Sequence, residues 1–231
     1  MSARAIVLAA GRGERMRPLT DACPKPLLEV RGQPLIAWHL DALAAAGHRE
    51  VVVNTAWLEE QIEQRLGAER RGMAIRYSRE GRDFGGALET AGGIVRALPL
   101  LDEVFWVVAG DVFVPGFAFD PRTYERFADS GRLAHLFLVP NPPHHPRGDF
   151  ALTAEGLAAN AGEPRHTYST IGLYRRSFFA GMPAGNPQGL KAPLAPLLRA
   201  AMDNGQVSAE LYTGPWTDVG TPERLAQLNA P

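Results

Sequence analysis

Residues 6–27 read IVLAAGRGERMRPLTDACPKPL. The aliphatic run at the start is typical of a buried strand, and it leads into a loop that holds Gly11, Gly13 and several arginines. Glycines let the backbone turn sharply and bring its N–H groups close to an anion, while guanidinium and ammonium groups supply the countercharge. With Lys25 fixed between two prolines further on, the stretch predicts a strand that ends in a triphosphate-binding loop.

Two commoner phosphate-binding loops do not fit these residues. The dinucleotide motif G-x-G-x-x-G requires a third glycine where Met16 stands, and Pro18 soon interrupts the helix that this motif should open. The P-loop requires a lysine directly after its second glycine, where this chain has Glu14. A plain Gly-x-Gly turn is the remaining alternative, and the coincidence of glycines, arginines and a lysine argues against it.

Residues 8–27 also match the opening pattern of a known family. They contain L-A-A-G-x-G-x-R-[ML]-x-P-L-T followed by P-K-P-L, and in this the chain resembles the sugar-1-phosphate nucleotidylyltransferases. Further landmarks of the resemblance lie at residues 54–58, 88–90, 141–150 and 216–221. The landmarks span nearly the whole chain, and the later ones favour the members that use UTP.

The composition is that of an ordinary globular chain. Of 231 residues, 45% are hydrophobic and 21% are charged, and the formal net charge is −1. This balance predicts no nucleic-acid partner and no polybasic membrane patch, and no apolar run reaches the ~20 residues of a membrane span. A single cysteine, Cys23, excludes an internal disulfide. We interpret Cys23 as a small filler rather than a catalytic thiol, and we expect a cytoplasmic protein.

Strand and helix patterns alternate along the chain, which favours an α/β fold with helices on both faces of a mostly parallel sheet. Residues 79–87, rich in glycine and arginine, are expected to form a mobile loop. Further strands are expected at 50–54, 73–78, 105–108, 133–139, 149–152, 168–174 and 207–212. Helices are expected at 34–46, 57–66, 88–98, 190–202 and from Thr221, the predicted N-cap, onward.

The resemblance implies the same architecture in more detail. It implies a Rossmann-like, GT-A-like three-layer αβα sandwich around a mixed, mostly parallel sheet. We expect one domain, 1–231, that carries no appended repeat. Within it, a nucleotide-binding part (about 1–111) and a sugar-phosphate-binding part (about 112–215) are expected to be woven together.

The nucleotide side is predicted to use the opening loop and one helix. Lys25, held by its prolines, is placed at the α-phosphate, where charge develops during transfer, and Arg15 at the departing phosphates. Ala10, Gly11 and Gly13 are expected to bind the nucleotide through their backbone. The pair Gly92 and Gly93 costs the predicted helix ~1–2 kcal/mol relative to alanine, and the resemblance places both glycines against the nucleobase.

Two aspartates are candidate Mg²⁺ ligands. Asp111 follows the apolar run 105–108 and Gly110, so it should lie at the carboxyl edge of the sheet, where open α/β folds bind ligands. Mg²⁺ prefers oxygen ligands and usually takes only one or two from the protein. A turn or N-cap role is the alternative for Asp111. The resemblance adds Asp218 as a second ligand of the same ion. Lys25, Arg15 and Asp111 are therefore the predicted catalytic residues.

The sugar-phosphate side is assigned by resemblance. The residues that look like an acceptor pocket are Asn141, Gly148, Asp149, Glu163, Ser169 and Lys191. Lys191 offers a charge for the sugar phosphate, although an exposed lysine at the start of a helix explains it equally well. His144 and His145 lack further partners at metal-ligand spacing, so we expect a loop near the substrate rather than a zinc site.

The resemblance implies an enzyme that transfers a uridylyl group from UTP to a sugar 1-phosphate, with N-acetylmuramate 1-phosphate as the expected acceptor in peptidoglycan recycling. The sequence does not fix the oligomeric state, and we expect a monomer. Guanylyl transfer from GTP to mannose 1-phosphate is the nearest alternative, and cytidylyl transfer is a more distant one. A non-catalytic nucleotide-sugar sensor is a third alternative, although such a protein has no need of Lys25 and the carboxylates. A glycosyltransferase fits less well, because Asp111-Val112-Phe113 lacks a second aspartate.

Overall fold

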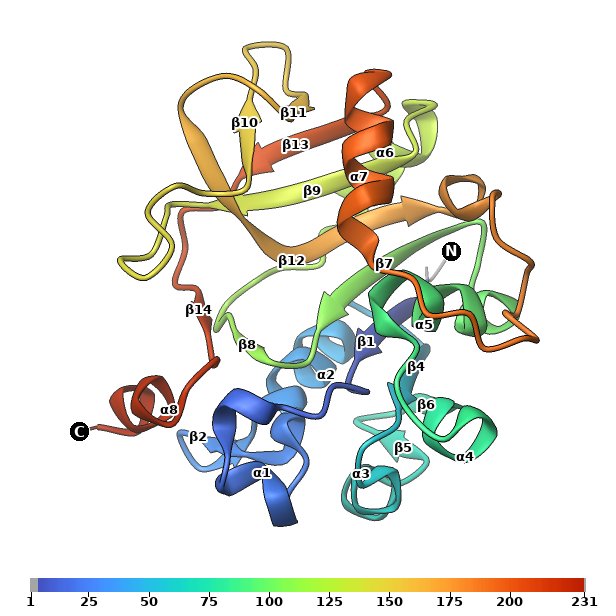
Figure 1. Cartoon of the computed structure of the whole chain (residues 1–231), viewed down its shortest axis with the longest axis vertical. Coiled ribbons are helices and arrows are strands. Elements are labelled where there is room, and N and C mark those ends of the chain that lie inside the picture. The colour runs from blue at the N-terminus through green and yellow to red at the C-terminus, as the bar shows by residue number, and fades with distance from the viewer. Residues whose placement is uncertain (1–3, 231) are drawn as a thin grey trace.

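Strand β1 (Ala5–Leu8) lies in the interior of a ten-stranded mixed sheet in the computed structural model, which describes residues 4–230. Its neighbours β4 (Glu50–Thr55) and β7 (Val104–Ala109) both run parallel to it, and β6 (Met73–Arg79) runs parallel to β4. The strand order is β11-β10-β12-β7-β1-β4-β6-β5, and β9 and β13 join beside β12 (Figure 1). The predicted α/β fold is confirmed, with parallel strands at the centre of the sheet.

The other elements complete the sheet, its two helical layers and two small two-stranded sheets, β2–β3 and β8–β14. The remaining strands are β2 (Glu29–Val30), β3 (Gln33–Pro34), β5 (Glu69–Arg70), β8 (Val112–Phe113), β9 (Ala134–Val139), β10 (Phe150–Leu152), β11 (Ala158–Ala159), β12 (Arg165–Arg175), β13 (Val207–Leu211) and β14 (Thr217–Asp218). The α-helices are α1 (Leu19–Ala22), α2 (Leu35–Ala45), α3 (Glu59–Leu66), α4 (Glu80–Phe84), α5 (Glu89–Ala97), α6 (Pro121–Asp129), α7 (Leu194–Asp203) and α8 (Pro222–Asn229). Short 3-10 turns lie at Glu14–Met16, Lys25–Leu27, Leu98–Leu100 and Arg176–Phe179.

Successive residues of the central strands pack on opposite faces of the sheet, as the period of a strand requires. Ile6 belongs to a hydrophobic core that includes side chains of α5 and α7. Val7 belongs to a second core, with side chains of α2, α3 and α6. The sheet therefore lies between two helical layers, which is the predicted αβα arrangement.

The second half of the chain adds antiparallel strands to the parallel centre. The long strand β12 pairs with β7 on one edge and with β9 on the other. Its register with β9 shifts between Tyr168 and Gly172, which marks a bulge next to the end of β7. Strand β14 pairs with β8 directly after Asp111, so the two predicted metal ligands come from neighbouring segments.

Helix α8 ends the chain beside the β2–β3 hairpin (Figure 1). Thr221 caps this helix through a bond from the Arg224 N–H, as predicted. Asn229 holds the hairpin by accepting from the backbone N–H of Arg31 and donating to the carbonyl of Glu29. None of the helices found between residues 4 and 230 combines the length and the hydropathy that a membrane crossing needs.

Two of the expected elements differ from the structure. The predicted mobile loop 79–87 contains helix α4, whose Glu80 is buried and whose Asp83 pairs with Arg96 of α5 at 2.7 Å. The predicted helix 190–202 begins only at Leu194, because residues 190–192 run along the start of α5, where the Ala192 carbonyl accepts from the Ala91 N–H. Helix α6 was not predicted at all.

Candidate functional site

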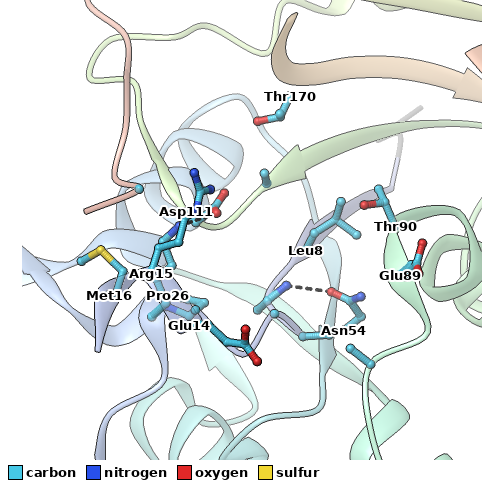
Figure 2. Close-up of a pocket in the computed structure, with 18 of the residues that line it drawn as sticks. Leu8, Glu14, Arg15, Met16, Pro26, Asn54, Glu89, Thr90, Asp111 and Thr170 are labelled. Atoms are coloured by element: carbon cyan, nitrogen blue, oxygen red, sulfur yellow. Dashed lines mark hydrogen bonds and ion pairs between the residues drawn. The ribbon is translucent and has the colours of Figure 1, made fainter. Parts of the chain in front are cut away.

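A cavity of about 540 Å³ lies at the carboxyl ends of β1, β4 and β7. Figure 2 shows Arg15 and Asp111 at one end of it and Asn54, Glu89 and Thr90 at the other. The predicted Ala10, Gly11, Gly13, Arg15, Lys25 and Asp111 all line this one cavity. Its full lining is Leu8, Ala9, Ala10, Gly11, Gly13, Glu14, Arg15, Met16, Lys25, Pro26, Asn54, Glu80, Ala87, Glu89, Thr90, Ala109, Asp111, Thr170 and Gly220.

Gly13 shapes the phosphate loop through both its conformation and its lack of a side chain. It adopts φ 68°, which favours glycine, and a Cβ at this position would lie 3.0 Å from Thr20 Cγ2 and 3.1 Å from Lys25 Cβ. The Gly13 carbonyl accepts from the Met16 N–H at 2.9 Å and from the Thr20 hydroxyl at 2.8 Å. The loop is therefore folded tightly around the base of Lys25.

Arg12 braces this loop from outside the cavity. Its guanidinium lies 3.7 Å from the Trp57 ring centroid and donates to the Thr20 carbonyl at 2.8 Å and to Asp21 at 2.9 Å. The Trp57 Nε1–H donates to the same carbonyl at 3.0 Å. Sequence reasoning did not foresee the bracing role of Trp57, which β4 brings beside the loop.

Arg15 is exposed and borders the cavity next to Asp111 (Figure 2). Within the described part of the chain, it makes no ion pair, whereas Arg12 and Arg17 both pair with Asp21. Of these three arginines, Arg15 is therefore the one that borders the cavity without a carboxylate partner among the described residues.

Lys25 is buried and forms an ion pair with Asp111, Nζ to Oδ2, at 2.6 Å. Asp111 is brought there because Gly110 packs closely on β1, donating its N–H to the Leu8 carbonyl at 2.8 Å. A Cβ at Gly110 would lie 2.9 Å from that carbonyl oxygen.

Burial raises the pKa of the nearby Cys23 thiol, which fits the filler role expected for it.

Asp218 lies on the segment next to Asp111, and the Val219 N–H donates to the Asp111 carbonyl at 3.0 Å. Arg224 contacts its Oδ2, and His144 Nε2 lies 2.8 Å from its Oδ1, yet this buried Oδ1 makes no hydrogen bond. Two carboxylates, one bordering the cavity and one with an unbonded oxygen, fit the chemistry of a Mg²⁺ site. Between residues 4 and 230, no cluster of three or more His, Cys, Asp or Glu side chains could hold a metal.

His39 lies beneath the metal-ligand segment. The Nε2–H of this fully buried ring donates to the Val112 carbonyl at 2.7 Å, one residue beyond Asp111. Burial lowers the pKa of His39 to about 4, against smaller opposing effects of the Val112 hydrogen bond and the Asp111 charge. His39 is therefore a neutral donor that fixes the start of β8.

Gly92 and Gly93, which were predicted to lie against the nucleobase, are not among the residues that line the cavity. A Cβ at Gly92 would lie 2.5 Å from the Leu190 carbonyl oxygen, and one at Gly93 would lie 2.5 Å from Glu80 Oε1. Both glycines therefore serve close packing of helix α5 against other parts of the protein. Glu89 and Thr90, just before them, do reach the cavity (Figure 2).

The residues predicted for the sugar side do not line the cavity either. Asn141 binds the 140–148 segment to β12, donating to the Pro146 and Arg165 carbonyls. A Cβ at Gly148 would lie 2.7 Å from Asn141 Oδ1. Asp149 accepts from the Tyr168 N–H and lies 3.1 Å from His145. These polar groups fold the loop together.

The other three predicted sugar-side residues lie apart from this loop core. Glu163 is exposed and accepts from the Arg165 N–H, while Lys191 is exposed beside α5. Ser169 is buried and accepts from the Ile171 N–H through its hydroxyl.

Thr170 of β12 lines the cavity, and it was not predicted from the sequence. It occupies the β12 bulge with φ 65°, a left-handed conformation that is rare for a β-branched residue. The Trp216 Nε1–H donates to the adjacent Ser169 carbonyl at 3.0 Å, which ties the bulge to the segment of Asp218. Figure 2 shows Thr170 across the cavity from the phosphate loop.

Comparisons with known proteins agree with this arrangement. Residues 4–149 match the family model described as "Nucleotidyl transferase". The chain is 48% identical to the N-acetylmuramate alpha-1-phosphate uridylyltransferase of Neisseria meningitidis, over 98% of this chain and 97% of that protein. It is 33% identical to the protein of the same name in Caulobacter vibrioides, over 95% and 92% of the two chains. A crystal structure titled as a glucose-1-phosphate thymidylyltransferase candidate from Bacillus anthracis shares the fold, with TM-score 0.78, 21% identity and coverage of 98% and 94%.

Proposed function

Because this chain belongs to the nucleotidyl transferase family of sugar-1-phosphate nucleotidylyltransferases, we propose that it transfers the uridylyl group of UTP to N-acetylmuramate 1-phosphate. The products are UDP-N-acetylmuramate and pyrophosphate, and the reaction belongs to peptidoglycan recycling. The choice of substrates rests on the two full-length relatives named for this activity. The observation that carries the reaction class is the meeting of the glycine loop, Arg15, Lys25 and Asp111 at one cavity.

The reaction needs little covalent work from the protein. A phosphate oxygen of the sugar phosphate attacks the α-phosphorus of UTP in line, and the bond to the bridging oxygen of pyrophosphate breaks. The second pKa of a phosphomonoester is near ~6, so the nucleophile is already largely ionised at neutral pH. The protein therefore acts by positioning the two phosphates and neutralising their charge.

The cationic residues have distinct roles in this proposal. Lys25 meets the charge that develops at the α-phosphate, because it is buried at the cavity wall and held by the loop around it. Arg15 holds the departing phosphates, because it has no ion pair within residues 4–230. The backbone of residues 10–13 surrounds the polyphosphate.

We further propose that Asp111 and Asp218 hold a Mg²⁺ ion. When bound, this ion supplies positive charge to the phosphate oxygens. Asp111 borders the cavity, and the Asp218 Oδ1 is buried without a hydrogen bond, so each can supply an oxygen ligand. Arg224 contacts the Asp218 Oδ2, whereas His144 Nε2 lies 2.8 Å from the Oδ1 itself, so the His144 ring would have to turn aside for this oxygen to reach the ion.

The acceptor sugar is proposed to enter from the β12 side. The nucleotide extends from the phosphate loop toward β4 and the start of α5, where Asn54, Glu89 and Thr90 lie. This leaves the wall formed by Ala109 and Thr170 for the sugar phosphate.

A panel of nucleoside triphosphates and sugar phosphates with pyrophosphate detection tests the function. We expect the highest kcat/KM with UTP and N-acetylmuramate 1-phosphate. Preference for GTP with mannose 1-phosphate would overturn the uridylyl assignment. Tight nucleotide-sugar binding without pyrophosphate release from any pair would instead indicate a sensor.

A further inference from the structure

The cavity wall contains a buried carboxylate that the proposed reaction does not use. Glu80, at the start of α4, is 0% exposed, and none of the described cations forms an ion pair with it. Its Oε1 accepts from Asn54 Nδ2 at 2.6 Å, and its Oε2 accepts from the Leu88 N–H at 2.7 Å. Each carboxylate oxygen thus accepts one hydrogen bond. Burial of the side chain raises the pKa of this carboxyl.

The hydrogen bonds continue from Glu80 to the phosphate loop. Asn54 is 3% exposed, and its Oδ1 accepts from the Ala9 N–H at 2.7 Å, the bond drawn in Figure 2. Three hydrogen bonds therefore join the end of β1, the end of β4 and Leu88, the residue before helix α5. We call this series the Glu80 bridge.

The neighbouring helix leaves space for this bridge. A Cβ at Gly93 would lie 2.5 Å from Glu80 Oε1 and 2.8 Å from Asn54 Nδ2. A glycine inside a helix costs roughly 1 kcal/mol relative to alanine. The bridge thus explains why α5 contains glycine at this position.

We propose that Glu80 is a positioning residue that sets the width of the nucleotide subsite. The bridge connects the two walls of that subsite, residues 9–11 on one side and 87–90 on the other. Among the residues described, no other hydrogen bond directly joins residues 9–11 to residues 87–90. This inference rests on the proposed function, because it assumes that a nucleotide occupies the space between these walls.

The hydrogen-bond pattern explains why a carboxylate is required. Both partners of Glu80 are donors, so the amide of Glu80→Gln places an NH₂ group against one of them. The exchange N54D/E80Q repairs this conflict. In this double variant, the new carboxylate at position 54 would accept from the Ala9 N–H and from the new amide at position 80. The carbonyl oxygen of that amide would accept from the Leu88 N–H, with one negative charge in the network as before.

The test compares Glu80→Gln, Asn54→Ser, the exchange N54D/E80Q, and Glu60→Gln as a control on the exposed surface of α3. Kd for UTP is measured by calorimetry, and KM is measured for each substrate. Hydrogen bonds to charged groups justify an expected rise of about 10- to 100-fold in Kd and KM for UTP in both single variants. The KM for the sugar phosphate should change less than about 3-fold, and the exchange should recover most of the UTP affinity.

Three results would overturn the proposal. The first is an unchanged Kd for UTP in Glu80→Gln, and the second is an equal loss for both substrates. The third is an exchange variant that folds but binds UTP no better than Glu80→Gln. If Glu80→Gln does not fold, Asn54→Ser and the exchange still give the comparison. If the wild type shows no uridylyl transfer, the proposed function fails, and the tightest-binding nucleotide of the panel then tests the bridge by calorimetry.

Discussion

Lowering the pH should destabilise this protein through His39. The ring is fully buried and donates to the Val112 carbonyl, and burial lowers its pKa from 6.5 to about 4. Between these two values the unfolded chain binds a proton that the folded chain does not. Stability supplied by this group is therefore complete above pH 6.5 and is lost as the pH falls toward 4.

The size of the effect follows from the two pKa values. Each pKa unit corresponds to ~1.36 kcal/mol, so His39 should lower the free energy of unfolding by about 1 kcal/mol at pH 5.5 and by about 3 kcal/mol at pH 4. Carboxylates with lowered pKa values, such as Asp41, add their own losses below about pH 4.5. A reference variant is needed to separate the two contributions.

His39→Gln is a suitable reference, because its amide can still donate to Val112 and does not titrate. Urea unfolding of both proteins from pH 7.5 to 4.5 gives the difference in free energy of unfolding at each pH. We expect this difference to be constant near pH 7 and to shrink by about 2–3 kcal/mol at pH 4.5. Two proteins that lose stability in parallel over this range would refute the neutral, buried His39.

Three further predictions concern the cavity. Asp111→Asn should lower kcat at least about 100-fold with the fold retained in circular dichroism, while Asp129→Asn, on the exposed end of α6, should leave kcat unaltered in the same pyrophosphate assay. Arg15→Gln should raise KM for UTP with Tm unchanged, whereas Arg12→Gln should lower Tm by removing the brace; the opposite pattern would reverse these roles. Thr170→Gly should raise Tm by roughly 2–4 °C in calorimetry, since glycine adopts φ 65° more easily, and a lower Tm would contradict the expectation that relief of strain at the bulge is the dominant effect.

The fold could be predicted well wherever hydrophobic periodicity was strong. The buried strands β1, β4 and β7 and the capped helix α8 lie where the sequence indicated them. Helix α4 could not be predicted, because its stability comes from the buried Glu80 and the Asp83–Arg96 pair, which join it to distant parts of the chain. Local composition at 79–87, rich in glycine and charge, pointed to a loop instead.

The residues of the candidate site could also be predicted only in part. The phosphate-loop residues follow the end of β1, and Asp111 follows the end of β7. Because these strands are parallel neighbours, the sequence could place both groups at the same edge of the sheet. The sugar-side residues were assigned mainly by resemblance, which does not reveal the contacts that each residue makes within the protein. In the structure Asn141 and Gly148 pack the 140–148 segment onto β12, and their contact with a sugar phosphate stays a prediction. Thr170 carried no sequence signal, because its position depends on a bulge in β12.

The brace of Arg12 and Trp57 bears on the energetics of substrate capture. A loop whose carbonyls already bond to Arg12, Trp57 and Thr20 keeps its conformation in the absence of a ligand. Binding then loses little conformational entropy in the chain, so most of the attraction between the loop and a polyphosphate is retained as affinity. Recognition at this end of the cavity should accordingly resemble the docking of two rigid bodies, with release governed by charge rather than by reordering of the chain.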